Sequence, residues 1–232
     1  MAVIGIIPAR GGSKRIPGKN KKNFSGKPLI SYIIEAALGA KMLDTIVVNS
    51  DDKDILAIAA NYEGVLPIER PAEISKDHSN AIEYVHQTLD MLSEQGKTFD
   101  TIVILQPTSP LTLPEDIDNT IMLLKNSNGN SSVSIMKLDH AVHPFKMKVM
   151  KGDKLNPFLE EERGRMAEHE LPTIYVRNGS VYVSTLETIQ TGKIIGDDCR
   201  GYVMPMERSI DINDPIDFDF AEFLYKKHYQ EE

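Results

Sequence analysis

AVIGIIPARGGSKRIPGKNKKNFSGKPL, residues 2–29, sets the architecture of the whole chain. Its first six residues are apolar, rich in β-branched side chains and followed by Pro8, which is typical of a short buried strand. A basic loop containing glycines comes next, and residues 28–40 then place apolar side chains on one face and predict a helix. Because glycines let backbone N–H groups approach a ligand closely, the loop predicts an anion-binding site.

Positive charge is concentrated in this loop, although the chain as a whole is acidic. The 232 residues carry a formal net charge of −8, which is unusual for a nucleic-acid-binding protein, and we expect no nucleic-acid partner. The segment from Arg10 to Lys22 nevertheless holds six basic residues and no acid: Arg10, Lys14, Arg15, Lys19, Lys21 and Lys22. Such side chains bind phosphate through charge-assisted hydrogen bonds. The loop therefore predicts a site for a small phosphorylated ligand, with Lys19 exposed; the alternatives are a solvated basic loop and a nuclear localisation run.

Two standard phosphate-binding motifs do not fit the loop. The dinucleotide pattern G-x-G-x-x-G is absent. A P-loop needs four residues between its glycines and then Lys-Ser/Thr, whereas Gly12 and Gly18 are separated by five residues and followed by Lys19-Asn20. The sequence therefore predicts a different cradle for a triphosphate.

Composition indicates a cytoplasmic protein. No run of about 18 apolar residues is present, so we expect neither a transmembrane helix nor a membrane partner. The apolar start of the chain is too short for a signal peptide. A single cysteine, Cys199, is compatible with a reducing compartment.

Strands and helices are expected to alternate as far as residue 138. The predicted strands cover residues 45–50, 64–68, 101–107 and 131–138, and the predicted helices cover residues 28–40, 51–62, 79–95 and 114–125. This order indicates an α/β fold with a mostly parallel sheet and helices on both faces. Functional loops of such a sheet lie at the carboxyl ends of its strands, which places the basic loop and Gln106 at one edge. A strand over 180–184, a short helix, a strand over 199–205 and a final helix after Pro215 complete the prediction.

Residues 139–175 interrupt this alternation. They contain alternating apolar and polar residues on both sides of a turn at Lys151-Gly152-Asp153, followed by a polar segment. We interpret them as a β-hairpin arm inserted into a single domain of residues 1–232. Because an isolated hairpin buries little surface, we expect the arm to form a homodimer.

Short polar and glycine-containing blocks recur along the chain. They are Ala9-Arg10-Gly11-Gly12-Ser13-Lys14, Lys19-Asn20, Gly26-Lys27-Pro28-Leu29, Ser50-Asp51-Asp52, Arg70-Pro71-Ala72-Glu73, Leu105-Gln106-Pro107-Thr108-Ser109-Pro110-Leu111, Asn178-Gly179 and Ser209-Ile210-Asp211-Ile212. Together, and in this order, they closely resemble the CMP-sugar synthetases, also called acylneuraminate cytidylyltransferases, and in particular the nonulosonate branch. The resemblance implies a Rossmann-like nucleotidyltransferase fold, CTP as donor, a nine-carbon sugar acid as acceptor, Mg²⁺, and a homodimer in which the arm of one subunit reaches the other active site.

The resemblance also implies roles for individual residues. The implied catalytic residues are Arg10, Lys14, Lys19 and Asp211, of which the first three hold the CTP phosphates with Ser13. Further implied substrate-binding residues are Asn20, Arg70 and Ser79 around the nucleobase, and Gln106, Thr108, Ser109 and Asn178. The implied magnesium ligands are Asp211, Asn213 and Asp214. Transfer of this kind depends on positioning and on charge neutralisation, which lysine, arginine and Mg²⁺ supply.

Two departures from the family pattern leave alternatives open. Asn213 stands where many relatives have a second aspartate, and Glu168 stands where the sialic acid enzymes have an arginine. Arg163, Arg165 or Arg177 could replace that positive charge, and a different acceptor is an equal alternative. The leading prediction is CMP transfer to an acid of the N-acylneuraminate or legionaminate type. The alternatives are transfer to the eight-carbon 3-deoxy-manno-octulosonate, and a catalytically impaired CTP-binding protein.

Overall fold

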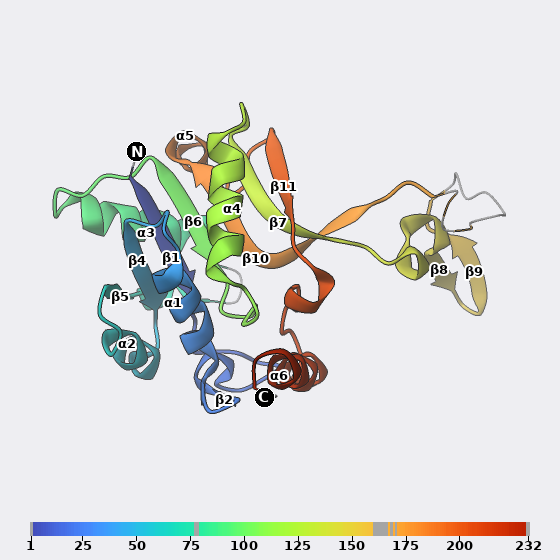
Figure 1. The fold of residues 1–232 in the computed structure, drawn as a ribbon, viewed down its shortest axis with the longest axis horizontal. Helices are drawn as coiled ribbons and strands as arrows, with labels where there is room; N and C mark the ends of the chain where they lie inside the picture. The colour runs from blue at the N-terminus through green and yellow to red at the C-terminus, as the bar shows by residue number, and fades with distance from the viewer. Residues whose placement is uncertain (1, 77–78, 160–166, 168, 170, 231–232) are drawn as a thin grey trace.

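A seven-stranded sheet forms the centre of the computed structural model, which describes residues 2–76, 79–159, 167, 169 and 171–230 (Figure 1). The strand order is β11-β7-β10-β6-β1-β4-β5. The bounds are β1 Val3–Pro8, β4 Thr45–Ser50, β5 Val65–Glu69, β6 Thr101–Leu105, β7 Ser131–Lys137, β10 Tyr175–Thr185 and β11 Cys199–Val203. Only the pairs of β10 with β6 and β7 are antiparallel within this sheet. The predicted α/β fold with a mostly parallel sheet is confirmed.

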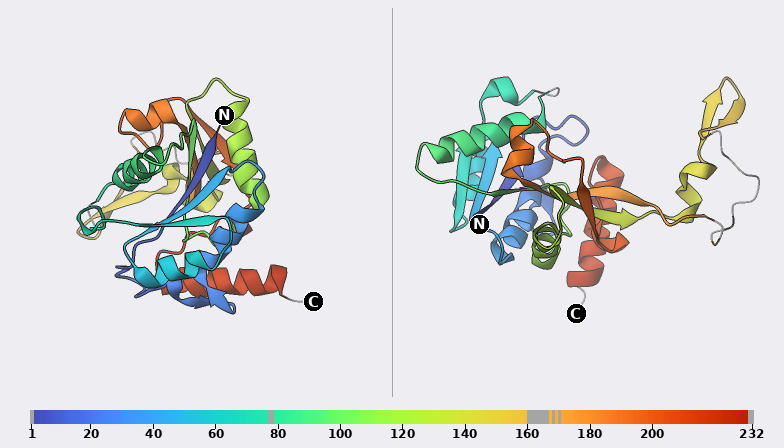
Figure 2. Two further views of the ribbon diagram at one scale, coloured as in Figure 1. Left: turned by 90° about the vertical axis from the view of Figure 1, so that its left-hand side faces the viewer. Right: turned by 90° about the horizontal axis from the view of Figure 1, so that it is seen from above.

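Helices cover both faces of the sheet, as predicted. They are α1 Leu29–Gly39, α2 Lys53–Ala60, α3 Ala81–Ser93, α4 Pro114–Lys125 and α5 Leu186–Gln190, whereas the last helix, α6 Pro215–Tyr229, packs against the basic loop. Side chains alternate along β1: Val3 and Ile7 belong to a core with α1, α2 and α4, whereas Ile4 and Ile6 belong to a core with α3 and α5. Figure 2 shows these two layers on opposite sides of the sheet. Because successive residues of a strand point to opposite faces, a strand buried on both sides is apolar throughout.

Two features of the chain path were not expected from the sequence. Strand β10 begins at Tyr175 rather than at residue 180, because its first residues pair with the end of β7 before a shift in register between Arg177 and Tyr182. Gly179 lies within this shift and has a φ of +77°, a conformation that favours glycine. Short elements also interrupt the basic loop, namely β2 Asn23–Phe24, β3 Lys27–Pro28 and the 3-10 helix η1 Lys19–Lys21.

A separate apolar cluster fixes the basic loop against the C-terminal helix. Ile16 and Phe24 of the loop are buried together with Phe218 of α6 and with Ile212, which precedes that helix. The Phe24 ring meets the Phe218 ring edge-on, with 5.4 Å between their centroids. Aromatic packing of this kind stabilises a defined arrangement. The loop is therefore held to a segment almost two hundred residues away in the sequence.

The predicted arm contains a hairpin of β8 Lys148–Lys151 and β9 Lys154–Pro157. Figure 1 shows it well away from the central sheet, beyond the ends of β7 and β10. Further 3-10 helices are η2 Ala72–Ile74, η3 His140–Val142, η4 Pro144–Lys146 and η6 Met206–Arg208. Arg163, Arg165 and Glu168 lie outside the described residues. The dimerising role of the arm stays a prediction.

Among the described residues, no helix is both long enough and apolar enough to cross a membrane.

Candidate active site

A pocket of about 510 Å³ opens at the carboxyl ends of β1 and β6, where the sequence places the functional loops. The loop after β1, the segment between β5 and α3, the start of α3 and the loop after β6 line it. Six cationic side chains contribute to its wall: Arg10, Lys14, Arg15, Lys19, Arg70 and Lys76. No aspartate or glutamate is among the described lining residues. A cleft lined by one sign of charge attracts an oppositely charged ligand, so this pocket favours a polyanion.

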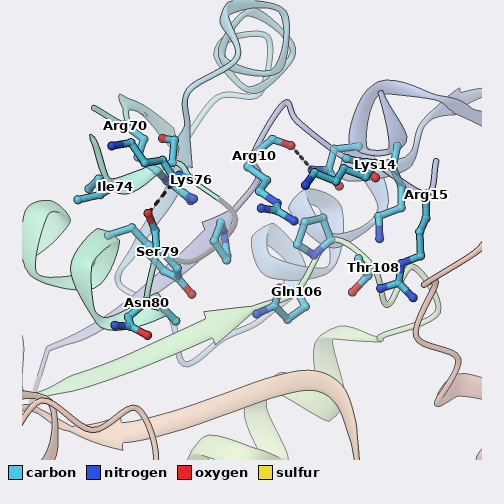
Figure 3. A pocket seen from close by; sticks show the side chains of 18 of the residues that line it. Arg10, Lys14, Arg15, Arg70, Ile74, Lys76, Ser79, Asn80, Gln106 and Thr108 are labelled. Carbon is cyan, nitrogen blue, oxygen red and sulfur yellow. Dashed lines mark hydrogen bonds between the residues drawn. The ribbon is translucent and has the colours of Figure 1, made fainter. Parts of the chain in front are cut away.

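The cations lie on two sides of the pocket. Figure 3 shows Arg70 and Lys76 near Ser79 on one side, and Lys14 and Arg15 on the other. Gln106 lies between the two sides and below them in this view. A ligand with two separated polar parts, such as a nucleotide with its phosphates, matches this arrangement.

Gly11 and Gly12, at the start of the basic loop, have different roles. The N–H group of Gly11 donates a hydrogen bond to Asp51 Oδ1 at 2.9 Å, so it is already engaged within the protein. A Cβ atom on Gly11 would stand 2.9 Å from the Cβ of Asp52, which is closer than real Cβ contacts allow. Gly12 has open space around its Cα. Gly11 is therefore required by packing against Asp52, and Gly12, rather than Gly11, is suited to close approach to a ligand.

Lys19 is not an exposed loop residue, contrary to the sequence-based expectation. Its ammonium group is half-buried and donates a hydrogen bond to the carbonyl oxygen of Ile212 at 2.6 Å. Burial lowers the pKa of Lys19, while the charge of Asp211 opposes that shift and the charge of Arg15 adds to it. The apolar packing of the loop against α6 brings this lysine to Ile212. A partly desolvated ammonium interacts with a phosphate more strongly than one in bulk water.

Asn20 and Arg70 are buried in the pocket wall, and Asn20 has incomplete hydrogen bonding. Asn20 Nδ2 donates to the carbonyl oxygen of Arg10 at 3.1 Å, but its buried Oδ1 has no partner among the described residues. The Arg70 guanidinium lies over the Tyr84 ring, 4.6 Å from its centroid. Because buried polar groups normally find partners, the Asn20 Oδ1 atom indicates a polar ligand in the pocket, and the Arg70 cation favours an anionic or polar group there.

The three predicted metal ligands differ in their surroundings. Asp211 Oδ2 accepts a hydrogen bond from Asn213 Nδ2 at 2.9 Å, and Asn213 Oδ1 accepts one from Arg15 Nη2 at 3.2 Å. Asp214 instead caps α6, because its carboxylate accepts from the N–H groups of Ile216 and Asp217. The part of the chain that the structure describes holds no group of three or more His, Cys, Asp or Glu residues suited to a metal. Asn213 lines the pocket, whereas Asp211 and Asp214 do not.

Comparison with known proteins gives matches over nearly the whole chain. A sequence model of cytidylyltransferases matches residues 4–231. The chain belongs to the cytidylyltransferase family. It is 34% identical over 226 residues to the CMP-N,N'-diacetyllegionaminic acid synthase of Legionella pneumophila, covering 97% of this chain and 96% of that protein. It is 32% identical over 231 residues to the pseudaminic acid cytidylyltransferase of Campylobacter jejuni, covering 97% of each.

A solved structure supports the same fold for this cytidylyltransferase. CMP:2-keto-3-deoxy-manno-octonic acid synthetase in complex with CTP superimposes with a TM-score of 0.72 at 17% identity, covering 98% of this chain and 99% of that one. The family resemblance and the Rossmann-like nucleotidyltransferase fold expected from the short sequence blocks are thus confirmed.

Most of the residues predicted for this cytidylyltransferase converge on the pocket, and two of the predicted substrate-binding residues do not. The pocket wall includes Arg10, Ser13, Lys14, Lys19, Asn20, Arg70, Ser79, Gln106, Thr108 and Asn213. Ser109 is fully buried outside it. Asn178 also lies outside the pocket wall. Its Oδ1 accepts a hydrogen bond from Ser134 Oγ at 2.6 Å, and its Nδ2 donates one to Ser209 Oγ at 2.9 Å. Asn178 thus joins β7 and β10 to the segment that carries Asp211, and direct contact with substrate stays a prediction.

Sequence reasoning gave no individual role to several residues of the pocket wall in this cytidylyltransferase, among them Arg15, Lys76 and Tyr84. Arg15 belongs to the basic run already identified, so the charge pattern was a sufficient signal for it. Lys76 lies within the segment between Arg70 and Ser79, both of which were predicted. Tyr84 could have been found only from the helical spacing of α3, which places it one turn after the residues that begin the helix.

Proposed function

We propose that this cytidylyltransferase transfers CMP from CTP to the anomeric hydroxyl of a nonulosonic acid of the N-acylneuraminate or legionaminate type and releases pyrophosphate. The pocket that joins six cations without a described carboxylate carries the proposal, because a triphosphate and a sugar acid together form a strongly anionic pair. Relatives named for legionaminic and pseudaminic acids, both above 30% identity over nearly the full chain, support a sugar acid as acceptor.

The pocket residues account for the reaction in physical terms. The anomeric oxygen attacks the α-phosphorus, the bond from that phosphorus to the bridging oxygen breaks, and the hydroxyl proton is released as pyrophosphate leaves. Charge accumulates on phosphate oxygens during this step, and the ammonium group of Lys19 with the side chains of Arg10 and Lys14 would neutralise it. Gln106, between the two cationic sides, and Thr108, on the side of Arg15, would orient the acceptor sugar for in-line attack.

A magnesium ion fits the donor set of this structure. Mg²⁺ is usually held by one or two carboxylates together with phosphate oxygens and waters, so a complete protein cage is not needed. Asp211 would provide the carboxylate. The residues that follow it, Ile212 and Asn213, accept hydrogen bonds from Lys19 and Arg15, which hold this segment next to the basic loop. Asn213 lies beside Asp211 as a candidate second ligand, and Asp214 already serves as a helix cap. When bound, the ion would supply additional positive charge to the triphosphate.

The deciding experiment is an assay of pyrophosphate release from CTP with a panel of sugar acids. We expect turnover with one or more nine-carbon acids and little with 3-deoxy-manno-octulosonate. Preferred turnover of the eight-carbon acid would favour the first alternative. Binding of CTP measured by calorimetry, without release for any panel member at high enzyme concentration with Mg²⁺, would favour an impaired CTP-binding protein.

We also propose that the active form is a homodimer built through the arm of residues 139–175. Large apolar side chains on and beside the hairpin are exposed: Met150 to 69%, Leu155 to 62% and Phe158 to 58%. An exposed apolar patch of this kind, on a projection with little core of its own, is typical of an interaction surface. A second copy is the partner that isologous pairing of two such arms would provide.

Replacing Met150 and Leu155 together by aspartate is expected to shift the protein from dimer to monomer, because two charges would be buried in the proposed interface. Sedimentation equilibrium at several protein concentrations measures the shift. Met122→Asp is the matched control, because Met122 is an exposed methionine of α4, 45% accessible, outside the arm. A wild-type protein that is monomeric and fully active would contradict the proposal.

A further inference from the structure

Asn49 connects the start of the basic loop with Arg70, although it does not line the pocket. It is the next-to-last residue of β4 and is fully buried. Its carbonyl oxygen accepts hydrogen bonds from the N–H of Ala9 at 3.0 Å and from Arg70 Nη2 at 2.9 Å. Its side-chain Oδ1 accepts a third hydrogen bond, from Arg70 Nε at 2.6 Å. Asn49 therefore contacts one whole edge of the Arg70 guanidinium.

Arg70 is a buried cation that needs further partners. It is 7% exposed and, within the described ranges, forms no ion pair with a carboxylate. A guanidinium has five N–H groups, and the two bonds to Asn49 use two of them. Arg70 also lines the pocket. The N–H groups that remain belong to a cation that lines the pocket, so they favour an anionic or polar acceptor there.

The donor side of the Asn49 amide is anchored as well. Asn49 Nδ2 donates to Gln87 Oε1 at 2.6 Å and to Thr88 Oγ1 at 2.9 Å, both on α3. Thr88 Oγ1 in turn donates to the carbonyl oxygen of Tyr84 at 2.8 Å, and the ring of Tyr84 lies against Arg70. Because both ends of the amide are engaged, it cannot rotate without losing hydrogen bonds. The acceptor is thereby kept towards Arg70.

We propose that Asn49 is a positioning residue of the nucleotide site, which holds the Arg70 guanidinium in the orientation that binds the pyrimidine nucleotide. This inference rests on the proposed function, in which the ligand of the pocket is CTP. An arginine side chain has several rotatable bonds, and fixing them before binding removes an entropic cost from ligand association. Asn49 holds one edge of the guanidinium by hydrogen bonds, and the Tyr84 ring packs against its face.

A purely structural role for Asn49 makes a different prediction, so the two can be separated. A buried amide that only satisfies hydrogen bonds would affect the stability of the fold and leave nucleotide affinity unchanged. A positioning role acts through Arg70 and therefore changes the affinity for CTP, with the KM for CTP rising more than kcat falls.

The test is calorimetric binding of CTP, without acceptor sugar, to the variant Asn49→Leu. Leucine has a similar size but leaves Arg70 Nε without its acceptor, so we expect CTP affinity to fall by about 10- to 100-fold, the range for a lost hydrogen bond to a charged group. Thr88→Val is the matched control: it removes a buried hydroxyl of the same network but leaves the Asn49–Arg70 contact and the second anchor of the amide at Gln87, so it should lower the melting temperature and weaken CTP binding far less than Asn49→Leu. Asn49→Ser, which is too short to reach Arg70 Nε, replaces the leucine variant if that does not fold.

A double-mutant cycle with Arg70→Ala decides whether the effect passes through the arginine. Once Arg70 is absent, Asn49→Leu should cause no further loss of CTP affinity. An equal loss in both backgrounds would overturn the proposal. Asn49→Asp keeps an acceptor for Arg70 and should bind CTP more tightly than Asn49→Leu, and equal weakness would also count against it. Wild-type protein that binds no CTP would overturn the proposed function itself, whereas normal CTP binding by Asn49→Leu would overturn this inference alone.

Discussion

Lys19→Ala is expected to lower kcat for pyrophosphate release by about 10²- to 10³-fold, the usual effect of removing one preorganised group that stabilises developing charge. The structure supplies the reason, because the ammonium group is half-buried in the pocket wall and its hydrogen bond to Ile212 fixes its position. The fold should survive. The variant loses one hydrogen bond, for which the change in the free energy of unfolding is about 1 kcal/mol. Single-turnover kinetics with saturating CTP measure the effect.

Lys21→Ala is the matched control for this prediction. Lys21 lies in the same 3-10 helix η1, but its ammonium group pairs with Asp52 at 2.9 Å and Asp54 at 2.7 Å and does not line the pocket. We expect kcat of this variant to stay close to that of the wild type. If the two lysine variants lose activity equally, general loss of loop charge explains the result and the specific role of Lys19 is wrong.

Asp211→Asn is expected to remove most of the stimulation by Mg²⁺ and to lower turnover by about 10²-fold or more. Asparagine keeps the size of the side chain and removes only the charge that Mg²⁺ favours. The protein packs closely around this carboxylate. A Cβ atom added to Gly179 would stand 3.2 Å from the carboxylate carbon of Asp211, and Asn213 Nδ2 donates a hydrogen bond to Asp211 Oδ2. Initial rates over a series of Mg²⁺ concentrations, at saturating CTP and acceptor, measure the effect.

Asp214→Asn separates the two acidic candidates for the metal. Asp214 accepts hydrogen bonds from the first N–H groups of α6, and asparagine is as good a helix cap as aspartate. This variant should therefore keep both its stability and its response to Mg²⁺. The opposite pattern, with Asp214→Asn impaired and Asp211→Asn normal, would transfer the ligand role to Asp214.

Much of the fold could be predicted because it depends on local pattern. Short β-branched runs alternate with amphipathic segments, and this period indicates strands and helices without knowledge of their partners. The basic loop follows β1, and Gln106 follows β6, so their meeting at one edge follows from the parallel direction of these strands. The early start of β10 could not be predicted, because its first residues form a strand only by pairing with β7.

The sequence predicted which residues line the candidate site better than it predicted how their side chains are buried and hydrogen-bonded. Charge density indicated six basic residues, of which four line the pocket (Arg10, Lys14, Arg15 and Lys19) and two do not (Lys21 and Lys22). The burial of Lys19 was missed because it requires the loop to pack on α6. Asn178 was assigned to substrate because of the family blocks, whereas its side chain is occupied by Ser134 and Ser209, which lie far away in the chain.

Periodicity and charge along the chain account for the order of its strands and helices, and for the position of a phosphate-binding loop after the first strand, because both are properties of neighbouring residues. The environment of each functional group arises only on folding. Lys19 reaches Ile212, and Asn49 reaches Arg70, across long sequence separations. Burial decides how strongly each charged group interacts with a ligand, and its hydrogen-bond partners decide how the side chain is oriented. Burial and partners alike depend on which distant segments pack together.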